Sequence, residues 1–124
     1  MPPKCVLLID NEDDIREIAT LTLELTNGWQ IAAASSGRHG LEIARELRPD
    51  AILLDVMMPD MDGPATLAAL QRDDVTRTIP VIFLTAKVQP ADRQRFHQLG
   101  VRGVIAKPFD PMTLAAEVGR ILEW

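Results

Sequence analysis

The sequence predicts a doubly wound α/β fold, in which one five-stranded parallel sheet is covered by helices on both faces. Three observations lead to this prediction. Short apolar runs rich in β-branched residues recur roughly every 25 residues. Several of them are apolar at successive positions, which is typical of parallel strands buried on both faces. The segments between them carry apolar residues at helical spacing, so strand and helix alternate five times.

We expect one strand at each apolar run. The five strands cover Cys5–Ile9, Gln30–Ala34, Ala51–Val56, Val81–Thr85 and Val101–Ala106. A ligand of such a sheet binds where the carboxyl ends of the strands meet. The residues that close these strands are therefore the first candidates for a functional site.

The first, second, third and fifth strands are each followed by a stretch with a helical stripe. The stripes are Ile15, Ile18, Ala19, Thr22 and Leu25, then Leu41, Ala44 and Leu47, then Leu67 and Leu70, and finally Leu114, Val118, Ile121 and Leu122. Asp62 and Asp110 each stand shortly before a proline, which predicts a capped helix start at both places. Gly28 and Gly100 are typical of helix ends.

The fourth helix is expected near Pro90–Leu99, and it is the weakest of the five. Most of its side chains are polar, and its anchors are limited to Ala91, Phe96 and Leu99. A helix with so few apolar contacts is readily displaced.

Length and composition indicate a single soluble domain over residues 1–124, with no output domain and a cytoplasmic location. A chain of 124 residues can bury a core without a disulfide, and Cys5 is its only cysteine. No apolar run is long enough to cross a bilayer, so we expect no membrane partner. The net charge of −5 argues against nucleic-acid binding.

The acidic charge is concentrated in the first half of the chain. Residues 1–62 hold 12 acidic and 5 basic side chains, a balance of 5 − 12 = −7, whereas residues 63–124 hold 6 and 8. Asp10, Glu12, Asp13 and Asp14 follow one another almost directly, and such a cluster repels anions unless a cation lies among them. This pattern predicts a bound cation.

Four strands end in side chains that suit phosphoryl chemistry. Asp10 and Asn11 follow the first strand, and the third, fourth and fifth lead into Asp55, Thr85 and Lys107. Carboxylates suit a hard cation such as Mg²⁺, which shares its coordination sphere with phosphate oxygens. An aspartate can attack phosphorus while a metal ion and a lysine neutralise the charge.

Four stretches of sequence carry a resemblance to a known family. They are LLIDNEDDIRE, ILLDVMMPDMDG, VIFLTA and IAKPFDP. In order and spacing they resemble the receiver domain of two-component response regulators, in particular its stand-alone, chemotaxis-regulator-like members. The resemblance implies a flavodoxin-like (βα)5 receiver fold with strand order 2-1-3-4-5. It also implies a phosphorelay role, without enzymatic activity beyond self-phosphorylation and self-dephosphorylation.

The resemblance assigns roles to the residues at the strand ends. Asp55 would accept a phosphoryl group from a histidine kinase or a histidine phosphotransfer protein, and a downstream protein target would read the outcome. Asp10, Asn11, Asp55 and the backbone carbonyl of Met57 would hold Mg²⁺. Thr85 would hydrogen-bond the phosphoryl group and Lys107 would pair with it. The peptide bond before Pro108 is expected to be cis.

The sequence departs from the family pattern in three respects. Asn11 stands where a second acid is usual, so we expect weaker Mg²⁺ binding, with Glu12 or Asp13 as compensating acids. Val104 replaces the common aromatic switch residue, so the loop after Thr85, the fourth helix or the backbone near Lys107 must carry the switch. Met57 and Lys87 occupy the positions that tune self-dephosphorylation. Neither offers an oxygen to orient water, which predicts a long-lived phosphorylated state.

Other interpretations remain open at this stage. Asp10 and Asp13 also suit the start of a helix, and His39 and His97 are expected on the surface without a role. A receiver-like binding module that needs no phosphate is the main functional alternative. A nucleotide-binding or phosphatase relative on a similar sheet is disfavoured, because the first strand is followed neither by a glycine-rich loop nor by an Asp-x-Asp pair.

Overall fold

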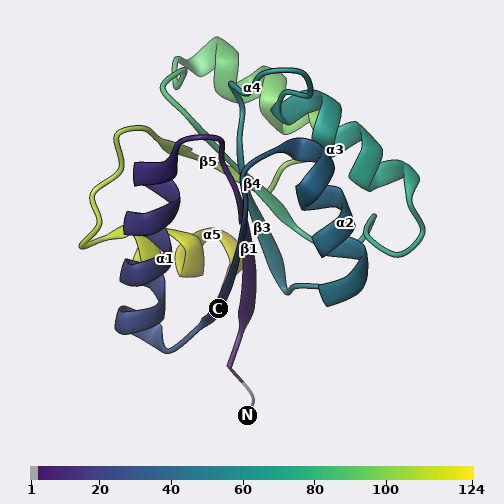
Figure 1. Cartoon of the computed structure of the whole chain (residues 1–124). Helices are drawn as coiled ribbons and strands as arrows, with labels where there is room; N and C mark the ends of the chain where they lie inside the picture. Colours follow the sequence, from purple (N-terminus) through teal and green to yellow (C-terminus); the bar gives the residue numbers. More distant parts are fainter. Residues whose placement is uncertain (1–2) are drawn as a thin grey trace.

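The computed structural model describes residues 3–124, which form a single sheet flanked by helices (Figure 1). The strands are β1 (Cys5–Ile9), β2 (Gln30–Ala34), β3 (Ala51–Asp55), β4 (Val81–Thr85) and β5 (Gly103–Ala106). The helices are α1 (Asp13–Asn27), α2 (Gly37–Leu47), α3 (Gly63–Arg72), α4 (Pro90–Leu99) and α5 (Leu114–Leu122). All pairings are parallel and the order is β2-β1-β3-β4-β5, which confirms the predicted fold.

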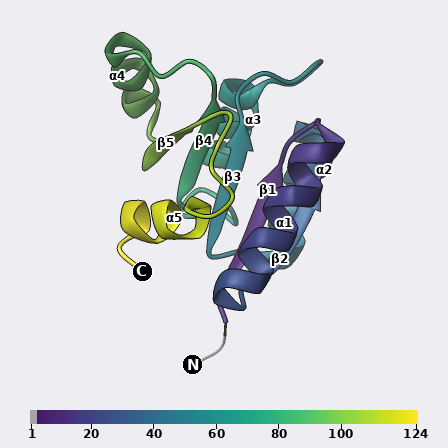
Figure 2. The ribbon, with the colours of Figure 1, turned by 90° about the vertical axis from the view of Figure 1, so that its left-hand side faces the viewer.

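The sheet separates two hydrophobic cores. On one face α1 and α5 pack together, and Leu23 and Val118 bury their side chains against β1 and β3 residues such as Leu8 and Leu53. On the other face lie α2, α3 and α4 (Figures 1 and 2). Because helices cover both faces, β3 and β4 are buried at every position. The central strands thus hold their ends rigidly in place.

Two strand boundaries differ from the sequence prediction. β3 ends at Asp55 rather than Val56, although the Val56 N–H still donates to the Leu84 carbonyl at 3.1 Å. β5 begins at Gly103 rather than Val101, because the chain leaves α4 through Gly100 in the left-handed region, with φ 104°. Val101 is therefore a core residue in the turn between α4 and β5, and its apolar character was misread as part of the strand.

The helix ends were predicted with mixed success. Asp62 caps α3 as expected, since its Oδ1 accepts the Ala65 N–H at 2.9 Å. The predicted start at Asp110 is wrong: its Oδ1 accepts the Met112 N–H at 2.9 Å and closes a turn, and α5 begins only at Leu114. Gly28 ends α1 in the left-handed region, which confirms that prediction.

The predicted stripe of α1 is partly wrong. Ala19 and Leu23 form its buried face, whereas Ile18 and Leu25 are 45% and 77% exposed. Leu25 lies two residues beyond Leu23, which places it about 200° further around the helix. The fourth helix has an even narrower attachment than expected: within Pro90–Leu99, Phe96 alone is buried. Among residues 3–124, no helix is both long and apolar enough to cross a membrane.

Candidate functional site

Two buried carboxylates meet at the carboxyl end of the sheet. Asp10 directly follows β1 and is fully buried, and Asp55 closes the neighbouring strand β3 with 2% of its surface exposed. Apolar strand residues precede both acids, so each acid lies at the end of a buried strand and is itself shielded from solvent. A buried carboxylate is costly unless it is paired, and the pairing partner comes from β5.

Lys107 follows β5 and places its ammonium group among three acids. Its Nζ lies 2.7 Å from Asp10 Oδ2, 3.3 Å from Asp55 Oδ1 and 3.4 Å from Glu12 Oε1. The lysine side chain is 13% exposed, so most of its length is held by the protein. The Lys107-Pro108 peptide bond is cis, as predicted. The four side chains form one continuous charged cluster.

Hydrogen bonds from the local backbone orient the two buried acids. The Glu12 N–H donates to Asp10 Oδ1 at 2.9 Å, and the Met57 N–H donates to Asp55 Oδ1 at 3.3 Å. Each carboxylate therefore has one oxygen fixed by the backbone of the loop that follows its strand. The second oxygens are left for other partners.

These second oxygens fit a divalent cation. Asp55 Oδ2 is buried and accepts no hydrogen bond from any described residue, and Asp10 Oδ2 has the Lys107 ion pair without hydrogen-bond geometry. A buried anionic oxygen without a donor is unfavourable, and a hard cation is the partner that such oxygens bind. The donor set consists of carboxylate oxygens, which suits Mg²⁺ better than a soft metal ion.

The charges shift the ionisation of the cluster. Burial of the Asp55 carboxyl, reinforced by the charge of Asp10, raises its pKa from 3.8 to about 6, although Lys107 acts in the opposite direction. Burial alone would lower the pKa of the Lys107 ammonium, but the close carboxylates of Asp10 and Asp55 outweigh it and raise the pKa. At neutral pH the cluster therefore holds a charged lysine and an Asp55 carboxylate that is destabilised by its surroundings.

Thr85 lies at the end of β4 beside this cluster. It is 1% exposed, its Oγ1 accepts the Lys87 N–H at 3.0 Å, and its carbonyl accepts the Lys107 N–H at 2.9 Å. Thr85 thus connects the loop before α4 to the backbone of the pocket lysine. The structure brings the predicted residues Asp10, Asp55 and Lys107 into direct contact, with Thr85 bound to the Lys107 backbone.

Glu12 was not in the predicted set of metal ligands, but the structure places its carboxylate at the site. Carboxylate oxygens of Asp10, Glu12 and Asp55 lie within 4.8 Å of one another. Asn11, which that set included, is exposed, and the Met57 side chain is 66% exposed. The metal-binding roles of Asn11 and of the Met57 carbonyl stay predictions. The sequence signal for Glu12 was its position as an acid two residues after Asp10, where its own N–H donates to Asp10 Oδ1.

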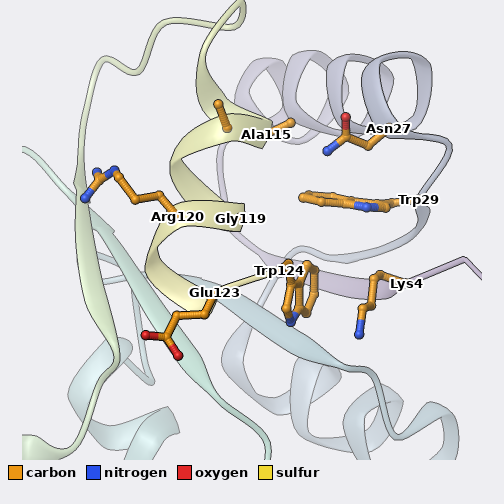
Figure 3. A pocket seen from close by; sticks show the side chains of 9 residues that line it. Lys4, Asn27, Trp29, Ala115, Gly119, Arg120, Glu123 and Trp124 are labelled. Atoms are coloured by element: carbon orange, nitrogen blue, oxygen red, sulfur yellow. The ribbon is translucent and has the colours of Figure 1, made fainter.

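A surface pocket lies away from this cluster. It has a volume of about 710 Å³ and lies between α5 and the segment from the end of α1 to β2, where Trp29, Lys4 and Trp124 line it (Figure 3). The indole rings of Trp29 and Trp124 pack edge to face with their centroids 5.2 Å apart, and Lys4 Nζ lies 4.9 Å from the centroid of the Trp124 ring. None of the described residues lining it belongs to the acidic cluster. Chemistry, rather than pocket size, therefore identifies the site.

Known proteins resemble the chain over nearly its whole length. Residues 6–119 match the family model described as the response regulator receiver domain. The phosphate regulon transcriptional regulatory protein PhoB of Escherichia coli K12 is 36% identical over 94% of this chain and 51% of its own length. The DNA-binding dual master transcriptional regulator RpaA of Synechocystis is 35% identical over 94% of this chain and 48% of its own. The chain thus spans about half the length of these curated relatives.

Solved structures agree in fold. The chemotaxis protein CheY4 of Vibrio cholerae superimposes with a TM-score of 0.89 and 31% identity, covering 97% of this chain and 99% of that one. The signal receiver domain of a histidine kinase from Syntrophus aciditrophicus gives a TM-score of 0.82 and 35% identity, covering 97% and 90%. The fold, the four quoted motifs and the family match agree, and the chain belongs to the response regulator receiver domain family.

Proposed function

We propose that Asp55 accepts a phosphoryl group and that the chain acts as a phosphorylation-controlled switch in two-component signalling. One observation carries this proposal: Asp55 is buried at a strand end beside a lysine, yet its Oδ2 accepts no hydrogen bond from any described residue. The Asp55 carboxylate thus keeps an oxygen that no donor among the described residues occupies, so the group can serve a metal ion and a phosphoryl group together. Receiver domains are phosphoacceptor switches rather than classical enzymes, and they accept the phosphoryl group on an aspartate.

The reaction forms one bond and breaks another. A carboxylate oxygen of Asp55 attacks the phosphorus of a phosphohistidine, the new O–P bond forms, and the P–N bond breaks with the electron pair returning to the imidazole nitrogen. Lys107 offsets the negative charge of the incoming group. Mg²⁺ bound at Asp10 and Asp55, with Asn11 and the Met57 carbonyl as the further ligands that the family resemblance implies, would neutralise charge on the phosphoryl oxygens. With a small phosphodonor the same oxygen attacks, which amounts to self-phosphorylation.

Phosphorylation then changes the surface near α4. The phosphoryl group adds roughly two negative charges beside Thr85 and Lys107. The Thr85 hydroxyl can leave the Lys87 N–H to bond the new oxygens, and the loop before α4 moves with it. Because Phe96 is the one buried anchor within α4, this helix is the element that two states can position differently. Val104 is not aromatic, so a rotation of an aromatic side chain at this position does not contribute to the change.

The partners follow from the reaction. A histidine kinase or histidine phosphotransfer protein supplies the phosphoryl group, and a downstream protein reads the altered surface. These reactions belong in the cytoplasm, with neither nucleic acid nor a membrane as a direct partner of this domain. We propose that residues 1–124 constitute one receiver domain.

Incubation with acetyl phosphate and Mg²⁺, followed by intact mass measurement, tests the proposal. We expect the mass of one phosphoryl group to be added to the native chain and to an Asp60→Asn control, and no addition to Asp55→Asn. Asp60 is a suitable control because it is exposed and lies five residues from Asp55 in the same loop, at φ 66°, which asparagine tolerates. An unmodified native chain would support the phosphate-independent binding module instead.

A further inference from the structure

We propose that Glu12, rather than Asn11, supplies the third carboxylate of the divalent-cation site, and that a bound cation displaces the Lys107 ammonium from this carboxylate cluster. The proposal rests on the proposed function insofar as the cation serves phosphorylation of Asp55. It concerns residues of this chain alone and can be tested without any phosphodonor.

The first argument is geometric. The carboxylate oxygens of Asp10, Glu12 and Asp55 lie within 4.8 Å of one another. An Mg²⁺ ion binds oxygens at about 2.0–2.1 Å, so opposite ligands on one ion are about 4 Å apart and neighbouring ligands about 3 Å. The three oxygens therefore need to converge by roughly an ångström to share an ion. Glu12 can make that adjustment because its side chain is 60% exposed.

The second argument is the unpartnered oxygen. Asp55 Oδ2 is buried, with the residue 2% exposed, and it accepts no hydrogen bond from any described residue. The Asp55 carboxylate belongs to the same cluster as Glu12, so this cluster already contains a buried oxygen without a hydrogen-bond donor among residues 3–124. An acidic group on the surface would not by itself indicate a site. A buried carboxylate oxygen without a donor, on a residue of the same cluster, is the second observation that does.

The third argument is the position of Lys107. Its Nζ lies within 3.4 Å of an oxygen of each of the three acids, so one ammonium group serves all three carboxylates in this structure. A cation bound among these three carboxylates must displace the ammonium group, because two positive centres repel each other at such distances. Lys107 released in this way is free to pair with an incoming anion.

Asn11 is less suited to the third position. Its amide carries no net charge, whereas the Glu12 carboxylate does, and no hydrogen bond or ion pair joins the Asn11 side chain to the cluster residues in the described structure. With Lys107 displaced, the three carboxylates carry a charge of −3, of which a divalent cation neutralises two. If Asn11 replaced Glu12 as ligand, the ion would face one negative charge fewer, and its affinity would fall accordingly.

The test is a Mg²⁺ titration followed by the amide chemical shifts of residues 9–13 and 55–58, without any phosphodonor. Glu12→Gln should weaken Mg²⁺ binding by roughly 3- to 10-fold, the effect of removing a partly exposed charge from a divalent ion. Asp13→Asn is the matched control. It removes one negative charge from the next residue, whose carboxylate is 89% exposed and pairs with Arg16 instead of the cluster. It should change the dissociation constant by less than about twofold.

Two further variants complete the test. Lys107→Met should bind Mg²⁺ more tightly than the native chain, because no ammonium competes for the carboxylates. Asn11→Asp combined with Glu12→Gln should recover affinity, because a carboxylate is restored beside the cluster. Unchanged amide shifts in α2 and α3 show that each variant has folded.

If Glu12→Gln and Asp13→Asn weakened Mg²⁺ binding equally, the role of Glu12 would be overturned, since the affinity would then depend only on the net charge of the region. Weaker Mg²⁺ binding by Lys107→Met would overturn the displacement. These failures are distinct from that of the proposed function. If acetyl phosphate modifies Asp55 but Glu12→Gln binds Mg²⁺ like the native chain, only the cation-site proposal fails. If Glu12→Gln weakens Mg²⁺ binding but Asp55 is never modified, only the proposed function fails.

Discussion

Replacing Asp55 by asparagine should stabilise the metal-free protein at neutral pH. The folded state holds this carboxyl with a pKa of about 6, raised from 3.8 chiefly by burial. The unfolded chain therefore ionises it more readily than the folded chain does, and this difference lowers the free energy of unfolding. Asparagine has nearly the same shape and no charge, so the variant escapes the penalty.

The size of the effect follows from the pKa difference. A rise of about 2 pKa units corresponds to about 3 kcal/mol at about 1.4 kcal/mol per unit. This penalty is fully present above the folded pKa of about 6 and disappears below the unfolded value of 3.8. We therefore expect a gain of about 1 to 3 kcal/mol at pH 7.5, because the variant also loses the contact with Lys107, and about half of that gain at pH 5.

Urea unfolding in the presence of a chelator measures this difference, and the buried Trp29 reports it by fluorescence. Asp74→Asn serves as control, because its carboxylate is 93% exposed and should leave stability nearly unchanged at both pH values. An Asp55→Asn variant that is less stable than the native chain, or whose gain does not shrink between pH 7.5 and 5, would refute the reasoning.

Three other predictions concern glycines in α3 and α5, the fourth helix and the phosphorylated state. Gly63→Ala should lower the free energy of unfolding, measured in urea, by about 2 kcal/mol or more, because a Cβ there would lie 2.7 Å from Val56 Cα and 2.8 Å from the Asp55 carbonyl oxygen. Gly119→Ala is the opposite case: a Cβ there would meet nothing within 4 Å, so alanine should stabilise α5 by about 0.5–1 kcal/mol. Phe96→Ala should remove the amide-exchange protection of α4 before that of the sheet, and equal loss everywhere would contradict its role as the anchor. The Asp55 phosphate should persist for minutes, measured by intact mass, because the side chain of Met57 offers no oxygen to orient water; loss within seconds would count against this.

The sequence sufficed for the sheet and for most of the pocket. Parallel strands covered on both faces are apolar throughout, so β1, β3 and β4 were recognisable, and the first polar residue at each strand end marked the site. Asp10, Asp55 and Lys107 were found in this way, and the structure brings them into contact. The start of α5 was missed because an acid before a proline caps a turn as readily as a helix.

Side-chain direction could not be predicted from spacing alone. Leu25 shared the apolar character of the α1 stripe but lies on the solvent side, because the buried face is set by the contact of α1 with the sheet and α5. Glu12 was weighed only as a compensating acid, since its approach to Lys107 joins residues 95 positions apart in the sequence. Contacts of this range depend on how the strand ends converge, which a local pattern does not contain.

The central claim is that Asp55 is the phosphoryl acceptor, and the most direct measurement locates the acyl phosphate chemically. The chain is incubated with acetyl phosphate and Mg²⁺ and then reduced with borohydride, which converts an aspartyl phosphate into homoserine. Peptide mass spectrometry identifies the converted residue. We predict homoserine at position 55 and at no other acidic residue. Homoserine at Asp10 or at another aspartate, or no conversion in a chain that has gained a phosphoryl group, would contradict the assignment.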